Sequence, residues 1–314
     1  FFGGQIAAEG LEQAIALYIQ ALAIDPSYAP SWDGLAASYL VQTNNDLRPA
    51  DEGYRLARNA AEKALSIDPG YAPAHESLAW LSLWYDNDLA AAAHHCERAL
   101  ALDPAHLGII RTAATVLDHL GRLDESIALG EYVTARDPVA SNAHTLLGHS
   151  YLYAGRWSEA AASYRAALRL SPNDIGSHHN LGLALLFKGE PQAALDEFIL
   201  EVDEEWLVKG RALALHALGR NNEHESRLTE LIDGWGSEWP SEVAHVFAFA
   251  GDADATFAWL DRAVAQNEAG LTEQFLLPFY RPVRTDPRWT AFLERVGSSP
   301  EQLVTVEFEV SLPE

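Results

Sequence analysis

Four prolines recur at nearly equal intervals between residues 69 and 172. The intervals are 35, 34 and 34 residues, and each proline closes an alanine-rich run. The four residues are Pro69, Pro104, Pro138 and Pro172. A fixed period of this length is typical of one helical hairpin repeated head to tail, in which each unit packs only against its neighbours. For a chain of 314 residues the period therefore favours one all-α repeat array, an α-solenoid, over two compact domains.

Residues 141–174 show the repeat most clearly. Residues 142–153 predict a first helix, Gly155 predicts a turn, and residues 158–170 predict a second helix that ends just before a proline. The apolar residues recur at i, i+3, i+4 and i+7, which is the pattern of one helix face. Proline stops the second helix because it has no amide hydrogen to donate.

The same template recurs along the chain, with small residues where two helices have to approach closely. The small residue of the first helix is found at Ala36, Ala79, Ala114, Gly148, Gly182, Ala212 and Ala244. The small residue of the second helix is found at Ala14, Ala57, Ala92, Ser126, Ala160 and Ala194. The turn glycine, which adopts a positive φ at little cost, is found at Gly121, Gly155, Gly189, Gly219 and Gly251.

Together these positions resemble the tetratricopeptide repeat (TPR) family, whose consensus is a 34-residue hairpin with small and large residues in this order. Trp32, Leu35, Ala36 and Tyr39 match the first helix of that consensus. The resemblance covers roughly residues 5–266. It implies a right-handed TPR superhelix of about seven helix pairs.

The chain departs from the repeat at three places. Pro26 and Pro69 are 43 residues apart, and the nine extra residues lie around 42–54. The units after Asp203 lack the closing proline, and residues 11–24 form a second helix without a complete first helix before it. The expected parts of the chain are a partial N-terminal repeat at 1–28, a TPR array at 29–266 and a C-terminal cap at 267–314.

Each open end of such an array exposes apolar surface unless it is capped. At the N-terminal end we expect a preceding segment, or Phe1 and Phe2 folded over the open face. At the C-terminal end residues 287–296 predict a short helix, and residues 304–312 alternate apolar and polar side chains. That alternation predicts an extended strand with one buried face. The strand either completes the cap, which we favour, or pairs with another chain.

The acidic composition bears on the choice of partner. Lys and Arg number 21 against 45 Asp and Glu, which gives a net charge of −24. A phosphate backbone is repelled by that field, so no nucleic-acid partner is expected. Both a merely solvated acidic surface and a preference for basic partners remain open. No apolar run is long enough to insert in a membrane, and the lone Cys96 is consistent with a reducing, cytoplasmic compartment.

The residues best suited to chemistry do not assemble into a predicted active site. His94, His95 and Cys96 are consecutive, and consecutive residues of a helix point about 100° apart, so they do not converge on one metal. Cys96 also occupies the large core position held by Tyr164 and Phe198 in other repeats. Metalloprotease, phosphate-loop and nucleophile-elbow motifs do not occur. We therefore expect no enzyme and no cofactor, and a metal-dependent hydrolase is the least favoured alternative.

The TPR resemblance implies a concave groove lined by the first helices, through their fifth, ninth and thirteenth places among others. The candidate groove residues are Trp80, Trp84, Arg111, Thr115, His119, Thr145, His149, Tyr153, His179, Leu183 and Phe187. The thirteenth places form a predicted ladder of rings, and aromatic rings are effective interface anchors. The equally weighted alternative is that these rings cover one another without a ligand. The Lys and Asn clamp that some family members use is absent, since Asp33 and Ala37 stand in its places.

Several longer segments resemble the C-terminal repeat region of bacterial signalling proteins. They are GLEQAIALYIQALAIDPSYAPSW, GRLDESIALGEYVTARDP, KGEPQAALDE and DPRWTAFLERVGSSPEQLVTVEFEVSLP. In those proteins an adenylate-cyclase or winged-helix domain comes first, and a TolB-like segment often precedes the repeats. The resemblance implies the regulatory or sensor region of a larger protein, a scaffold that binds an extended protein segment. One alternative is a periplasmic location, if the region is attached to a transmembrane regulator. Another is a structural spacer or a homodimer that forms through the end repeats or the tail.

Overall fold

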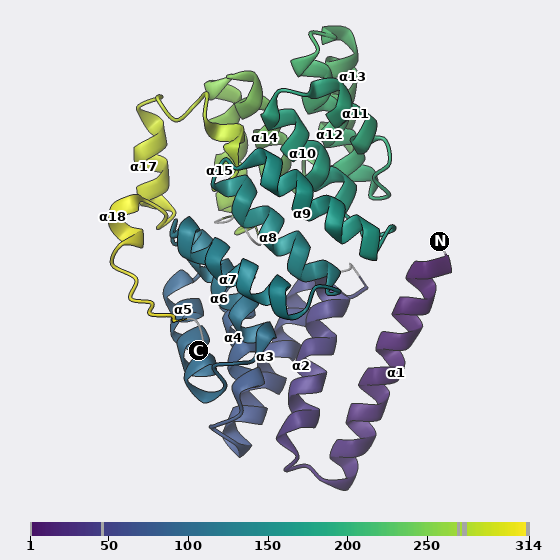
Figure 1. The fold of residues 1–314 in the computed structure, drawn as a ribbon, viewed down its shortest axis with the longest axis vertical. Coiled ribbons are helices and arrows are strands. Elements are labelled where there is room, and N and C mark those ends of the chain that lie inside the picture. Colours follow the sequence, from purple (N-terminus) through teal and green to yellow (C-terminus); the bar gives the residue numbers. More distant parts are fainter. Residues whose placement is uncertain (1, 45–46, 269–270, 272–274, 312–314) are drawn as a thin grey trace. The chain divides into compact units, whose positions relative to one another are not determined.

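The computed structural model describes residues 2–44, 47–268, 271 and 275–311, and its regular elements in those residues are all helical (Figure 1). The helices of the repeats are α1 (Phe2–Ile24), α2 (Ala29–Asn44), α3 (Ala50–Ile67), α4 (Ala72–Trp84), α5 (Leu89–Leu102), α6 (Leu107–His119), α7 (Leu123–Arg136), α8 (Ser141–Tyr153), α9 (Trp157–Leu170), α10 (Ser177–Lys188), α11 (Pro191–Phe198), α12 (Glu204–Ala217), α13 (Asn221–Trp235), α14 (Pro240–Ala250) and α15 (Ala253–Ala265). The 3₁₀ turn η1 (Pro278–Tyr280) and the helices α17 (Arg288–Arg295) and α18 (Pro300–Leu303) follow.

Helices that follow one another in sequence pack as pairs, which confirms the predicted all-α repeat architecture. The pairs are α2 with α3, α4 with α5, α8 with α9, α10 with α11, α12 with α13, and α14 with α15. The five turn glycines all have positive φ, between 68° and 91°. Their role in the turns is therefore confirmed, because other residues are strained in that conformation.

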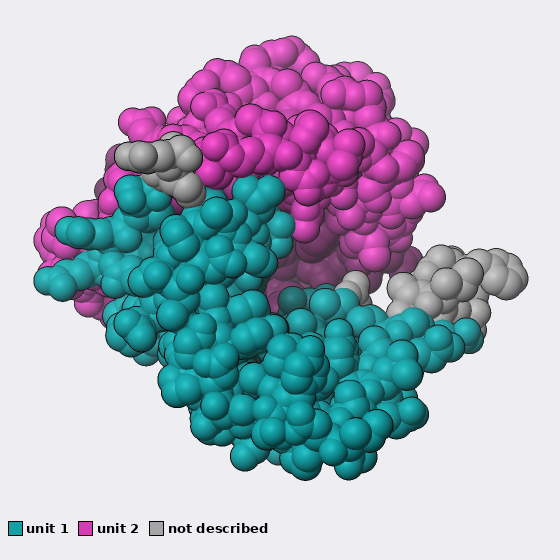
Figure 2. Space-filling model, turned by 60° about the horizontal axis from the view of Figure 1, so that its bottom comes forward, with its two compact units in different colours: residues 1–116, 307–314 teal, residues 117–306 magenta. Residues whose placement is uncertain are grey.

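The chain divides into two compact units (Figure 2). Unit 1 comprises the residues up to Val116 together with the tail from Glu307, and unit 2 comprises Leu117–Val306. The boundary between the units falls within α6. Among the described residues, no helix combines the length and the apolar composition that a membrane span requires.

Small residues and large rings meet between neighbouring helices as the repeat pattern predicts. A Cβ added at Gly148 of α8 would lie 2.6 Å from Cε1 of the Tyr164 ring in α9. Phe198 is completely buried between Gly182 of α10 and Gly210 of α12, where a Cβ would overlap the ring from either side. Cys96 is completely buried at the corresponding place of α5, and burial raises the pKa of its thiol. The prediction of a structural thiol is confirmed.

The nine extra residues lengthen a hairpin instead of forming a separate loop. α2 has 16 residues and α3 has 18, against 13 in α4 and 14 in α5. Hydrogen bonds hold the far end of the longer hairpin together: the Tyr54 hydroxyl donates to Asn44 over 2.9 Å, and the Arg48 Nε donates to Gln42 over 2.9 Å.

The two ends of the chain differ in part from their predictions. The N-terminal helix runs on from Phe2, nine residues before the expected start, and Phe1 lies outside the described residues. At the other end α17 matches the predicted helix, but the described tail residues up to 311 form no strand. The backbone N–H of Glu309 donates to the Glu97 carboxylate of α5 over 2.7 Å, and Phe308 is buried. The predicted strand is therefore wrong: in the described tail Phe308 is buried but Val304 is 82% exposed, and the tail residues of unit 1 lie against helix α5.

Candidate functional site

The candidate groove residues divide between the two units. Trp80, Trp84, Arg111 and Thr115 belong to unit 1, and the other seven belong to unit 2. All of them lie on the first helices of the repeats. We call these faces the inner wall of unit 1 and the inner wall of unit 2.

The inner wall of unit 1 contains a fixed pair of tryptophans. The rings of Trp80 and Trp84 are nearly parallel, with centroids 5.6 Å apart and planes at 14°, and both are half-buried. The Trp80 indole N–H donates to the Thr112 hydroxyl over 3.0 Å, and that hydroxyl donates to Oε1 of Glu76 over 3.0 Å. Glu76, Trp80 and Trp84 are four residues apart along α4 and so share one helix face. We call these three residues the α4 stripe.

Two carboxylates accompany the tryptophans. Glu76 occupies the fifth place of α4, and Asp33, at the fifth place of α2, accepts a hydrogen bond from the Ser77 hydroxyl over 3.1 Å. Burial raises the pKa of Asp33 to about 6, the Ser77 hydrogen bond opposes this rise, and the Glu76 charge adds to it. Among the described residues neither carboxylate forms an ion pair. Sequence analysis did not predict Glu76 as a groove residue, although its position four residues before Trp80 places both on one helix face.

The other two candidates in unit 1 differ in accessibility. Arg111 is half-buried. Thr115 is buried, and its hydroxyl donates to the Arg111 carbonyl over 3.2 Å. Thr115 is therefore closed to a partner in this conformation.

In unit 2 several candidate side chains are packed away. His119 and Leu183 are buried, and Thr145 is half-buried. His179 is 3% exposed, and its ring lies against Phe198 and Trp206 with centroid distances of 5.3 and 5.7 Å. Burial holds the pKa of His179 well below its usual value. A partner would reach His119, His179 and Leu183 only after the unit had opened.

His149 and Tyr153, at the ninth and thirteenth places of α8, form a ring pair within one helix, and the predicted ladder of thirteenth places across repeats stays a prediction. Their centroids are 6.2 Å apart with nearly parallel planes, and both residues are half-buried. His149 also lies 5.7 Å from the ring of Tyr164 in α9, and burial lowers the pKa of His149 to about 4. The imidazole is therefore neutral at physiological pH.

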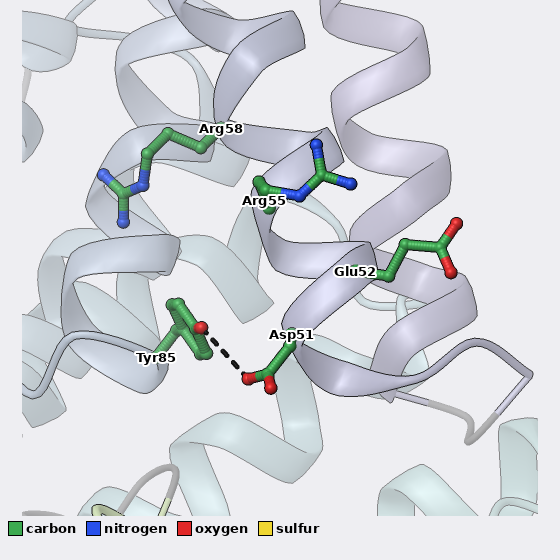
Figure 3. A pocket seen from close by; sticks show the side chains of 5 residues that line it. All are labelled: Asp51, Glu52, Arg55, Arg58 and Tyr85. Atoms are coloured by element: carbon green, nitrogen blue, oxygen red, sulfur yellow. Dashed lines mark hydrogen bonds between the residues drawn. The ribbon is translucent and has the colours of Figure 1, made fainter.

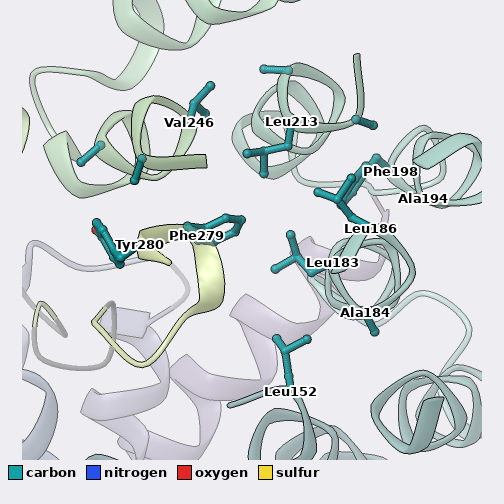
Figure 4. Packing of buried hydrophobic residues seen from close by; sticks show 14 of the residues in the cluster. Leu152, Leu183, Ala184, Leu186, Ala194, Phe198, Leu213, Val246, Phe279 and Tyr280 are labelled. Atoms are coloured by element: carbon teal, nitrogen blue, oxygen red, sulfur yellow. The ribbon is translucent and has the colours of Figure 1, made fainter. Parts of the chain in front are cut away.

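One wall residue of unit 2, Phe187, is covered by the protein's own chain. The covering residue Phe279 and its neighbour Tyr280 lie in the buried cluster of this unit (Figure 4). Phe279 is completely buried, with its ring centroid 5.3 Å from Phe187 of α10 and 4.7 Å from His245 of α14. The Arg281 guanidinium lies over the ring of Trp157, 4.9 Å from its centroid. We call residues 275–284 the internal segment. The sequence predicted this stretch only as a loop, and its closely spaced aromatic residues were the available sign of burial.

Beneath the internal segment lies a group of buried ionisable side chains that sequence analysis did not identify. Lys209 of α12 and Glu242 of α14 form an ion pair, and His245 Nδ1 lies 3.6 Å from the same carboxylate. Burial by itself would raise the pKa of Glu242, but Lys209 and His245 hold it well below the usual range. Burial raises the pKa of Glu268 to about 7, although Ser241 donates two hydrogen bonds to it. Their spacing along the chain follows no recognisable motif.

A depression of about 520 Å³ lies beside the lengthened hairpin of unit 1 (Figure 3). Its lining residues are Asp51, Glu52, Arg55, Arg58 and Tyr85. The Tyr85 hydroxyl donates to Asp51 over 3.3 Å, and Arg58 pairs with Asp86. In the described part of the chain no group of His, Cys, Asp and Glu side chains is arranged to hold a metal ion. His94 is exposed while Cys96 is buried, so these neighbours face different surroundings.

Comparison with protein-family models finds matches in the middle of the chain. Residues 83–149 match a model described as tetratricopeptide repeat, and residues 148–189 match a model described as TPR repeat. These residues are tetratricopeptide repeats. No curated protein matches the sequence.

Solved structures of TPR proteins share the fold. The type IV pilus biogenesis factor PilW has a TM-score of 0.56 and is 20% identical, over 70% of this chain and 98% of the PilW chain. A monomeric mutant of IFIT1, solved with Gppp-AAAA, has a TM-score of 0.57 and 15% identity, over 82% and 67% of the two chains. A TPR protein from Parabacteroides merdae has a TM-score of 0.54 and 13% identity, over 78% and 98%. At these identities the comparisons establish the TPR fold and say nothing of a ligand.

Proposed function

We propose that this chain is a protein-interaction scaffold that holds an extended partner segment against the inner wall of unit 1. The observation that carries the proposal is the α4 stripe, in which hydrogen bonds through Thr112 fix the half-buried Trp80 indole and the half-buried Trp84 indole stacks on it. Rigid aromatic side chains supply large contact area at little entropic cost, which makes them effective anchors.

The internal segment of unit 2 is a second observation that supports the same function. Phe279 of its aromatic turn, Pro278–Tyr280, packs against Phe187 at the thirteenth place of α10 and against His245 of α14. A wall of this construction therefore has the shape and the apolar character to hold an irregular segment. For unit 1 we propose that the segment comes from another protein.

The finer proposal is that the scaffold is the regulatory or sensor region of a larger bacterial signalling protein. The resemblance of its longer segments to the repeat regions of such proteins supports this. Reading the coding sequence upstream of Phe1 tests the proposal. An adenylate-cyclase or winged-helix domain there agrees with it, and a coding region without either contradicts it.

A nucleic-acid ligand is not part of the proposal. The IFIT1 structures were solved with Gppp-AAAA and with PPP-AAAA. The present chain has a net charge of −24, which repels a phosphate backbone.

A homodimer through the N-terminal repeat is a second candidate, favoured by the exposed apolar side chains of α1. Leu17 is 64% exposed and Ile24 is 87% exposed. Analytical ultracentrifugation of the wild type and of Leu17→Glu/Ile24→Glu tests this candidate. A wild-type dimer that dissociates in the variant supports the candidate. A wild type that stays monomeric at every protein concentration up to the solubility limit overturns it.

Replacement of both stripe tryptophans tests the main proposal. Trp80→Ala/Trp84→Ala should abolish capture of peptides selected on the wild-type chain, because the anchors are lost, while costing only about 1–3 kcal/mol of stability, because both rings are half-buried. The matched control is Trp259→Ala, which removes a half-buried tryptophan from the second helix α15 of unit 2. Equal peptide capture by the double variant and the control would refute the function.

A further inference from the structure

We propose that the α4 stripe recognises a partner segment in which a lysine or arginine stands next to an aromatic or large aliphatic side chain. The inference rests on the proposed function, because it specifies the partner of the same wall. The cation lies on the indole faces of Trp80 and Trp84 with the Glu76 carboxylate as its counter-charge. The neighbouring apolar side chain covers the rest of the accessible indole surface.

The first argument is charge. Glu76 and Asp33 stand at the fifth places of two successive first helices of unit 1. The Thr112 hydroxyl donates a hydrogen bond to Glu76, and the Ser77 hydroxyl donates one to Asp33. Ser77 and Thr112 satisfy an oxygen on each carboxylate but leave the negative charges uncompensated. Charge-assisted hydrogen bonds are roughly twice as strong as neutral ones, so a cation is the complement that gains most from this surface.

The second argument is the geometry of the rings. The planes of Trp80 and Trp84 are 14° from parallel, and the Thr112 hydroxyl connects the Trp80 indole to the Glu76 carboxylate through two bonds of 3.0 Å. An aromatic face with a carboxylate at its edge attracts a cation through the ring quadrupole and through direct charge. Because the hydrogen bonds already fix both groups, binding loses little side-chain entropy.

The third argument comes from the internal segment of unit 2. There Phe279 packs on Phe187 while Arg281, two residues later, places its guanidinium over Trp157. Within unit 2, therefore, a phenylalanine packs on a wall residue and a nearby arginine packs on a tryptophan. Unit 1 has the tryptophans and the carboxylate that such a combination would contact.

The overall charge of the protein favours the same partner. With a net charge of −24, the chain attracts basic segments at long range and repels acidic ones. Association should accordingly weaken as salt is added, because the Debye length falls from about 10 Å at 0.1 M to about 3 Å at 1 M.

The test is a selection of random nonapeptides, displayed on phage, on the immobilised full chain. We expect enriched sequences to pair Lys or Arg with an adjacent aromatic, Leu or Ile residue, and to disappear on Trp80→Ala/Trp84→Ala. For one synthetic enriched peptide, Glu76→Gln should weaken binding about tenfold, since it removes a charge from a charge-assisted contact. The matched control Glu62→Gln, at an exposed position of α3, should change binding less than about twofold.

The outcomes separate this inference from the proposed function. Tryptophan-dependent enrichment of acidic or uncharged peptides, or an unchanged affinity on Glu76→Gln, overturns the inference and leaves the scaffold function standing. Enrichment that does not depend on the tryptophans overturns both. If the double variant loses its helical circular dichroism, Trp84→Leu replaces it, because leucine keeps much of the apolar volume and removes the indole face.

Discussion

The inner walls of units 1 and 2 are built from the same repeat and differ in what their ninth and thirteenth places contact. In unit 2, Phe187 lies against Phe279 of the internal segment. In unit 1, Trp80 and Trp84 stack on each other and remain half-buried. The same repeat thus supplies a face of first helices in both units, and in unit 2 a later segment of the chain packs against one residue of that face.

The two walls also differ in how their charges are balanced. In unit 2 the carboxylate of Glu242 is paired with Lys209 from the neighbouring first helix. In unit 1 the carboxylates of Asp33 and Glu76 accept hydrogen bonds from hydroxyl groups. In unit 2 the buried charge of Glu242 is balanced by a lysine of the same unit. In unit 1 we propose that the two carboxylates are balanced by a cation of the partner segment.

The largest expected effect is that of Phe279→Ala, which separates the two walls directly. The ring is completely buried, so its loss should destabilise unit 2 by about 3–5 kcal/mol through lost burial and the remaining cavity. Hydrogen exchange of the α10 and α14 amides measures this change, and the α2 and α4 amides of unit 1 should keep their protection. The control Phe247→Ala, at a half-buried position of α14, should cost less. Equal losses from the two substitutions would show that the internal segment is not part of the core.

A somewhat smaller effect is expected from Lys209→Ala. Removing one member of a buried ion pair leaves the Glu242 carboxylate uncompensated, at a cost of about 3 kcal/mol. Lys209→Met combined with Glu242→Gln removes both charges and should recover most of that loss. The stability of both variants is measured as the midpoint of urea unfolding, with hydrogen exchange of the unit 2 amides as the readout. If the double variant is as unstable as the single one, the pairing of charges is not what stabilises this wall.

The smallest expected effect is a dependence of unit 2 on pH above neutrality. Burial raises the pKa of Glu268 to about 7, so the folded state keeps a proton that the unfolded state has already lost. The contribution of Glu268 to stability should therefore fall by about 1 kcal/mol between pH 6.5 and 8.5 as Glu268 ionises in the folded state. His179 and His245 act in the opposite direction, because burial lowers their pKa values and the unfolded state binds the additional protons. Their contribution is complete only about one pH unit above the ordinary histidine pKa.

The variant Glu268→Gln is the control for this pH dependence. Glutamine still accepts hydrogen bonds from Ser241 but does not ionise. Urea midpoints of unit 2 at the two pH values should then differ less in the variant than in the wild type. Glu205, whose pKa burial raises to about 8, retains its own share of the slope. An identical slope in both proteins would remove Glu268 from the explanation.

The repeats themselves were predictable from the sequence because their determinants are local. The turn glycines, the facing pair Gly148 and Tyr164, and the buried Cys96 all follow from spacing within one or two repeats. The lengthened hairpin was visible as a longer period, but the sequence did not show that the extra residues extend α2 and α3.

Contacts between distant positions were not predictable in this way. Glu201 and Glu268 each follow the second helix of a pair and accept backbone N–H groups at the start of the first helix, at Gly176 and at Ser241. The acid and the helix start are 25 and 27 residues apart. An acidic side chain at that distance carries no local signal, although it stabilises the positive end of the helix dipole.

By itself, then, the amino-acid sequence determined the helices, their turns, their pairing and the residues of the inner walls, because each depends on neighbours within a 34-residue period. The tertiary structure decided which wall is covered, since the position of Phe279 over Phe187 depends on a segment nearly a hundred residues away. It also decided the neighbours of each charge, from Lys209 and Glu242 to Glu76 and Trp80. Periodicity specifies a face, but burial and ion pairing depend on everything that packs against that face.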